Sequence, residues 1–585
     1  MSRQRPVFRL RRRMAATDLT QMDLNRLVYR WMKDILWPEK NYFWLAIIYG
    51  LGIALLGLAT PISVQLLINS IANTALPVPL FTLSLMLFGL LVLSGLLSVL
   101  RIHLMELYRR RFMARLVADL TMRVINAADP FFQDDRRFDL FNRYFELVNM
   151  QKAVPSLLIG GFTIVLGMVV GFIVTSFYHP FFLAFNLVLI ALLWAVWAIW
   201  SRGAMKTSIN LSHEKYNAAH FLETIGASNG FYKSARHIDY ALDGAERVTA
   251  NYVKAHAAHF AYQFPQTIAF YLLYAAASAG LLALGGWLVI QEQLSIGQLV
   301  AAELILSGVF AGMNSLYSYL DDWYDLVASI EELSLLYGLK QEPPASKGLA
   351  PPQGGALAMN RVRVNLPIGR AELNLTIPQG SRLVCQGVPG MEREFADLLK
   401  RLDQPESGLI TLGGVDIALM DPLALRSDVM VLDRASIVES TIADYLQLAN
   451  PARNAADQMA ALRLVGLEDR IALLPDGIHT RLSSTGAPFS VAKMMQLKLA
   501  AAILSEPRLL VMSPLFDTLT LSRLKAVFAH FRARNTTILY FSNRPEAVTL
   551  DGWLWMGLDQ QLITQSRAEF DQLRGAAGRE TVDGD

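Results

Sequence analysis

Six long apolar stretches in the first 320 residues constrain the fold of this chain more than any other feature. They lie near residues 42–67, 80–100, 153–178, 181–200, 265–290 and 295–318. A hydrocarbon layer about 30 Å thick is crossed by roughly 20 apolar residues in a helix, so each stretch is long enough to span a membrane. Composition agrees, because 53% of the 585 residues are hydrophobic and only 18% are charged. The sequence therefore predicts an integral membrane protein with six transmembrane helices, in contact with a lipid bilayer.

Composition also excludes several classes of site. The single cysteine, Cys385, rules out an internal disulfide and clustered-thiolate metal centres. The nine histidines show no metal-ligand spacing, so no metal site is predicted. A net charge of only +3 gives no general footprint for nucleic acid, and no nucleic-acid partner is expected.

The distribution of Lys and Arg predicts the orientation of the chain in its membrane. Basic residues gather in the amino-terminal segment, between spans two and three, and between spans four and five, whereas the connections at 68–79, 178–180 and 291–294 contain none. Because positively charged loops stay on the cytoplasmic side, both termini are expected to be cytoplasmic. A short basic amino terminus without a transit signal favours a bacterial inner (plasma) membrane.

The two long basic links are expected to be helical. Apolar residues recur three and four apart in 101–128, and less regularly in 213–256. Spans two to five are therefore predicted to continue as long helices into the cytoplasm.

Glu303 is the only formal charge within a predicted span. A charge at that depth usually faces a protein or water-filled interior, which makes Glu303 a candidate for the substrate pathway. Two alternatives remain open: Glu303 is paired structurally, or the span boundary lies elsewhere.

Composition changes after residue 340, where EPPASKGLAPPQGG has the character of a linker. Beyond it, the apolar runs SRLVCQG, SGLITLGG, DVMVLD, RLLVMS and TTILYFS predict buried strands of an α/β domain. The predicted organisation is an amino-terminal segment (1–41), a six-span membrane domain (42–335), a linker (336–355), an α/β domain (356–577) and a tail (578–585).

This arrangement resembles a half-transporter of the ABC exporter (type I) family. TIPQGSRLVCQGVPG is similar to the family's strand and phosphate loop, and LSSTGAPFSVAKMMQLKLAAAILSEPRLLVMS is similar to its signature helix and following strand. TPISVQLLINSI and ADPFFQDD resemble segments of the peptide and protein-secretion branch. The resemblance implies a P-loop-NTPase-like second domain, head-to-tail pairing of two such domains around ATP, and contacts to them from residues near 133–145 and 221–233.

The phosphate loop departs from the family's GxxGxGK[ST] pattern. Gly387 and Gly390 keep two glycines, and Arg393 keeps a positive charge where lysine would reach the phosphates. Glu392 replaces the third glycine and Glu394 replaces the hydroxyl that holds magnesium. Either the two glutamates exclude phosphate, or they complement the positive end of their own helix.

The other chemical positions of the family also differ here. Ser513 and Pro514 stand where two carboxylates would bind magnesium and orient water. Asp433 aligns with the metal-sensing Gln, and Asn543 aligns with the switch His. In the signature FSVAK (489–493), Ser490 alone remains.

We therefore expect a pseudo-ATPase half-transporter that pairs with a second ABC half-transporter, in a homodimer or a heterodimer, to export an unidentified substrate. A vestigial nucleotide site would consist of Gly387, Gly390, Arg393 and Ser490, with no catalytic residue and no cofactor. Two alternatives stay open. One is an ATP-driven exporter with a non-standard nucleotide site that binds ATP and Mg²⁺, and the other is a membrane scaffold or receptor that transports nothing.

Overall fold

The computed structural model describes residue 30 and residues 32–73, 77–128, 141–342, 352, 354–544 and 550–572. The described chain divides into two compact units, a helical one that ends at Gln341 and an α/β one that begins at Glu342. Parts of several predictions lie outside the described residues: most of the segment 1–41, half of the linker 336–355, most of ADPFFQDD with the contact residues 133–140, and the tail.

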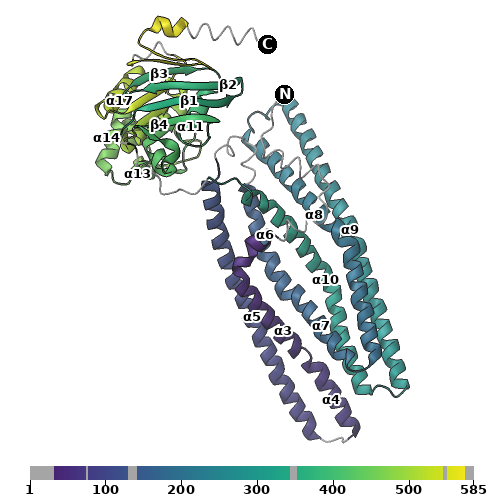
Figure 1. Cartoon of the computed structure of the whole chain (residues 1–585). Helices are drawn as coiled ribbons and strands as arrows, with labels where there is room; N and C mark the ends of the chain where they lie inside the picture. Colours follow the sequence, from purple (N-terminus) through teal and green to yellow (C-terminus); the bar gives the residue numbers. More distant parts are fainter. Residues whose placement is uncertain are drawn as a thin grey trace. The chain divides into compact units, whose positions relative to one another are not determined.

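The helical unit is built from long helices (Figure 1). They are α3 (Lys40–Leu56), α4 (Ala59–Asn73), α5 (Pro77–Ile125), α6 (Tyr144–Ser156), α7 (Phe162–Ser176), α8 (Pro180–Ala227), α9 (Ala235–Ile290) and α10 (Ile296–Tyr337), with a π-helical turn (Leu157–Gly161) joining α6 to α7. In the described part of the chain, six helical segments are long and apolar enough to cross a membrane. The predicted six spans are confirmed.

The predicted extensions of spans two to five are also present. At 1.5 Å per residue, the 49 residues of α5 reach about 74 Å, more than twice the thickness of a hydrocarbon layer. α8 and α9 are similarly long, with 48 and 56 residues, and pack against each other. The predicted contact residues 221–227 form the end of α8, and a turn follows them.

Local sequence fixes where the last helices begin. His179 accepts a hydrogen bond from the backbone N–H of Phe181 at the start of α8, where Pro180 occupies the first helical position. Ser295 and Gln298 form a reciprocal capping box at the start of α10. Helix α10 then packs against α4, α6, α7, α8 and α9, and so forms the centre of the unit.

The α/β unit contains two larger sheets. An antiparallel sheet has the order β2-β1-β4-β5, from strands β1 (Leu357–Leu366), β2 (Gly369–Ile377), β4 (Ser407–Leu412) and β5 (Val415–Asp416). A six-stranded sheet has the order β12-β11-β3-β10-β9-β6, from β3 (Arg382–Gly387), β6 (Val429–Leu432), β9 (Leu509–Met512), β10 (Thr537–Phe541), β11 (Gly552–Met556) and β12 (Gln561–Thr564). All five strands expected from the apolar runs are present, which confirms the predicted fold class.

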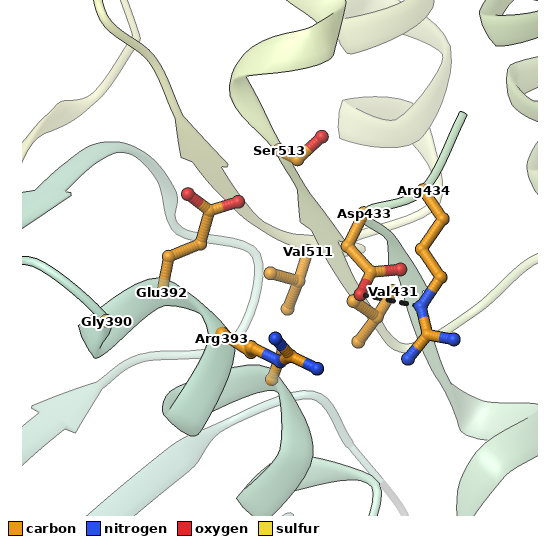
Figure 2. A pocket seen from close by; sticks show the side chains of 9 residues that line it. Gly390, Glu392, Arg393, Val431, Asp433, Arg434, Val511 and Ser513 are labelled. Atoms are coloured by element: carbon orange, nitrogen blue, oxygen red, sulfur yellow. Dashed lines mark ion pairs between the residues drawn. The ribbon is translucent and has the colours of Figure 1, made fainter. Parts of the chain in front are cut away.

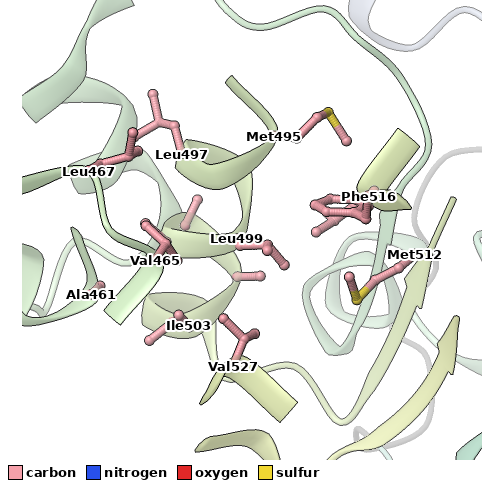
Figure 3. Close-up of a cluster of buried hydrophobic side chains, with 14 of the residues drawn as sticks. Ala461, Val465, Leu467, Met495, Leu497, Leu499, Ile503, Met512, Phe516 and Val527 are labelled. Carbon is pink, nitrogen blue, oxygen red and sulfur yellow. The ribbon is translucent and has the colours of Figure 1, made fainter. Parts of the chain in front are cut away.

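A core of buried apolar side chains packs α16 (Val491–Ser505) against the six-stranded sheet (Figure 3). It includes Leu497 and Leu499 of α16, Met512 at the end of β9, and Phe516, which lies in the short helix Pro514–Thr518. All four are at most 1% exposed. This packing fixes the end of β9, which lines a cavity in the same unit.

Candidate functional site

A cavity of about 430 Å³ opens at the carboxyl edge of the six-stranded sheet (Figure 2). Because β3, β6 and β9 run parallel within this sheet, the residues that follow them meet at one edge. The cavity is lined by Gly390, Glu392, Arg393, Ala396, Val431, Asp433, Arg434, Val511 and Ser513. The fold thus brings together three positions identified from sequence, after β3, β6 and β9.

A helix begins four residues after the end of β3. Gly390 adopts φ +88°, a left-handed conformation that favours glycine, and caps α11 (Met391–Leu399). Glu392, Arg393 and Glu394 are therefore all in the first turn of a helix. The backbone N–H of Val388 donates to Met556 and that of Met391 donates to Val388, so neither is directed at a ligand. Two backbone donors of this loop are therefore unavailable to a phosphate.

Glu392 places a carboxylate inside the cavity. Figure 2 shows its side chain extending from α11 toward the end of β9 that carries Ser513. Burial, together with the nearby Asp433, raises the pKa of Glu392 to about 7. Near neutral pH the Glu392 carboxyl is therefore partly ionised, and its negative charge disfavours a polyphosphate in this part of the cavity.

The basic groups around the cavity are engaged with carboxylates and carbonyls. Arg393 Nε lies 4.0 Å from Asp397, and Arg434 Nε lies 3.8 Å from Asp433. Lys498 of α16 is largely buried, and its Nζ donates to the carbonyl oxygen of Arg434 at 2.5 Å. Burial lowers the pKa of Lys498, and the charge of Asp433 partly offsets that effect.

The end of β9 lacks a carboxylate. Ser513 is buried and its hydroxyl accepts a hydrogen bond from the backbone of Leu515, which begins a short helix at Pro514. Neither residue can take a proton or bind magnesium as an anion. The residues around this cavity do not fit a magnesium-nucleotide complex.

Asp517 forms a hydrogen-bond network that sequence reasoning missed. Its Oδ1 accepts from Ser542 Oγ at 2.8 Å and from the Tyr540 hydroxyl, and its Oδ2 accepts from the backbone N–H of Asn543 at 2.9 Å. Asn543, at the position of the switch histidine, is thus tied through its backbone to the chain after β9. The sequence signal that could have identified Asp517 is the acidic residue in PLFDT, which directly follows the apolar run RLLVMS.

The remaining predicted site residues are not part of the cavity lining. Gly387 ends β3, and Ser490 is exposed at the amino end of α16, where its side chain makes no capping hydrogen bond. In α10, Glu303 Oε1 accepts from Ser307 Oγ at 3.1 Å, while its Oε2 is buried and accepts no hydrogen bond from the described residues. Of the predicted site residues, Gly390 and Arg393 line the cavity, whereas Gly387, Ser490 and Glu303 do not.

Comparison with known sequences gives relatives that match part of the chain. No family model matches it. The chain is 30% identical over 258 residues to an exotoxin translocation ATP-binding protein of Pasteurella aerogenes, and 29% identical over 258 residues to an alpha-hemolysin translocation ATP-binding protein of Escherichia coli. Each match covers 43% of this chain and 36% of the relative, so little more than a third of those relatives' length is matched.

Comparison with solved structures covers nearly the whole chain. A bacterial Atm1-family ABC exporter with ATP bound matches with a TM-score of 0.74 at 17% identity, over 92% of this chain and 96% of the other. The chain therefore has the fold of an ABC exporter.

Proposed function

We propose that this chain is one half of an ABC-type exporter whose α/β unit does not hydrolyse ATP and which works with a second half-transporter in a lipid bilayer. The exporter fold, the six spans and relatives named for translocation support the transport assignment. The proposal that this unit does not hydrolyse ATP rests on the end of β9, where Ser513 and Pro514 offer no carboxylate.

The mechanism of such a pair follows from the helical unit. The long helices of each half supply one side of a pathway, and rocking of the two bundles exposes it to either face of the membrane. The free energy comes from ATP bound through the partner. The α/β unit of this chain then acts as a structural or regulatory lever, because its sheet and core are complete while its cavity is not suited to nucleotide.

Thermal melting of the purified full chain with and without millimolar Mg-ATP tests this function. A ligand at about 100 times its Kd stabilises a protein by about 2.7 kcal/mol, so binding would raise the melting temperature by several degrees. We expect no change in the melting temperature of this chain. A half-transporter with intact nucleotide motifs is the control, and its melting temperature should rise under the same conditions. A shift accompanied by ATP turnover would instead support an ATP-driven exporter with a non-standard site.

Glu303 is proposed to line the substrate pathway, because its Oε2 is buried without a hydrogen bond from the described residues and α10 packs at the centre of the helical unit. Export by the assembled pair should fall in Glu303→Gln and be retained in Glu292→Gln, which alters the exposed connection after α9. Unchanged export in Glu303→Gln contradicts the pathway role. If removing either half of the pair leaves export unchanged, the chain is a scaffold.

A further inference from the structure

His213, Glu331 and Glu332 come together in the helical unit, although His213 and Glu331 are 118 residues apart in sequence. His213 Nε2 lies 3.0 Å from Glu331 Oε2 and 3.6 Å from Glu332 Oε1. One ligand atom from each of the three residues lies within 4.8 Å of the other two. The sequence predicted no metal site because spacing along the chain could not reveal this group.

Two parallel helices create the cluster. His213 follows the predicted end of span four by 13 residues on α8, and Glu331 follows the predicted end of span six by the same number on α10. At 1.5 Å per residue, both lie about 20 Å beyond the apolar spans. The His213 side chain is 39% exposed, whereas Glu331 is 11% and Glu332 0% exposed, so the imidazole lies on the solvent side of the cluster.

The buried carboxylate of Glu332 is incompletely satisfied. It is 0% exposed, and Arg143 Nε donates to its Oε2 at 3.0 Å. Its Oε1, which faces His213, is buried and accepts no hydrogen bond from the described residues. A buried anionic oxygen without a donor is costly, and so this oxygen points to a cation.

Glu146 of α6, an equally buried carboxylate nearby, provides the contrast. Lys215 Nζ and the Tyr216 hydroxyl donate to its Oε1, both at 2.6 Å, and Ser329 Oγ and Asn149 Nδ2 donate to its Oε2. The same unit therefore satisfies one buried carboxylate fully and leaves the other with an oxygen directed at His213. The two carboxylates are equally buried, so burial alone does not explain the difference.

The distances suit a divalent metal. Two ligand atoms about 2.1 Å from a common ion, at a tetrahedral angle, are about 3.4 Å apart, and the two contacts of His213 Nε2 bracket that value. A hydrogen bond from the imidazole would satisfy Glu331 alone. One imidazole with two carboxylates is a donor set for Zn²⁺ or Mn²⁺, whereas Mg²⁺ prefers oxygen ligands only.

We propose that His213, Glu331 and Glu332 bind a divalent transition metal, Zn²⁺ or Mn²⁺, which joins α8 to α10 beyond the membrane spans. Arg143 holds Glu332 in place and compensates part of the negative charge. Glu146 is paired separately, with Lys215 Nζ 2.6 Å from its Oε1. Because the imidazole must be unprotonated to bind metal, affinity falls as the pH is lowered.

The test uses the full chain, treated with EDTA and purified in detergent. Binding of Zn²⁺ is measured by titration calorimetry, and binding of Mn²⁺ is measured by its electron paramagnetic resonance signal. We expect one equivalent per chain and at least about a 100-fold loss of affinity in His213→Ala. His256→Ala, which removes an exposed imidazole from α9, is the matched control and should bind as the wild type does.

Glu332→Gln provides a second variant, because its amide oxygen still accepts from Arg143 while the charge is lost. It should also bind at least about 10-fold more weakly, with helical content and elution volume unchanged. Absence of binding by the wild-type chain overturns the proposal, as does equal binding by wild type and His213→Ala. A melting temperature that depends on pH but not on metal would assign a proton, and no metal, to the cluster.

Discussion

The core around α16 and the cavity beside α11 lie in the same α/β unit but follow different rules. The core is apolar and close-packed, with Met494, Leu497 and Leu499 completely or almost completely buried. The cavity is bordered by charges of both signs and contains Glu392 beside Asp433. The contrast teaches that a scaffold depends on volume and apolarity, whereas the chemistry of a site depends on individual polar atoms, so one can persist without the other.

The largest effect is expected in the core. Phe516→Ala removes a side chain with no exposed surface and leaves a void, which costs about 4 kcal/mol and lowers the melting temperature by about 10 °C. Leu473→Ala, at a position that is 76% exposed, is the control and should change melting by less than about 2 °C. Equal effects of the two variants would show that the core does not determine the stability of this unit.

A smaller change, an increase in melting temperature, is expected from a substitution in the cavity. In the folded chain the pKa of Glu392 is raised to about 7, so the folded state holds a proton that the unfolded state releases near pH 4.5. The stability from that proton is fully present below pH 4.5 and is lost as pH rises through 7. Glu392→Gln should therefore raise the melting temperature at pH 8 by a few degrees, about 2 kcal/mol after allowance for partial solvation, and much less at pH 5.

Glu394→Gln controls for the position at the start of the helix. It makes the same chemical change two residues on, where the side chain does not line the cavity but still meets the positive end of α11. We expect no stabilisation at pH 8 in this variant. A gain from Glu392→Gln that is the same at pH 5 and pH 8 would contradict the raised pKa.

The smallest expected effect tests the chemistry of the cavity directly. The triple change Glu392→Gly, Arg393→Lys and Glu394→Ser restores the phosphate-loop pattern but leaves Ser513 and Pro514 at the end of β9. ATP turnover, measured as phosphate release, should remain at background because no carboxylate binds magnesium or orients water there. Robust turnover in the triple variant would overturn our assignment of the strand end.

The spans and strands were predictable because they depend on short-range patterns. A run of about twenty apolar residues is long enough to span a membrane, and short apolar runs such as RLLVMS are typical of strands buried within a sheet. The strand ends could also be located, since parallel strands bring their carboxyl ends to one edge. The family resemblance had singled out Ser513 and Asp433, and both line the cavity together with residues of α11.

The contacts of individual polar atoms were not predictable. Lys498 was recognisable only as a lysine within an apolar helix, and its bond to the backbone of Arg434 depends on how α16 meets the chain after β6. Asp517 finds Ser542 and Asn543 because β9 and β10 are neighbours. Such partners are chosen by tertiary packing.

The sequence by itself determined that this chain crosses a membrane six times, carries an α/β unit, and lacks carboxylates at the end of β9, because each property is local. Only the tertiary structure decided that Glu392 would share a cavity with Asp433 and that His213 would meet Glu331 and Glu332. The physical reason is distance: hydrogen bonds and metal bonds act over about 3 Å, and residues far apart in sequence come that close only after the helices and strands have packed.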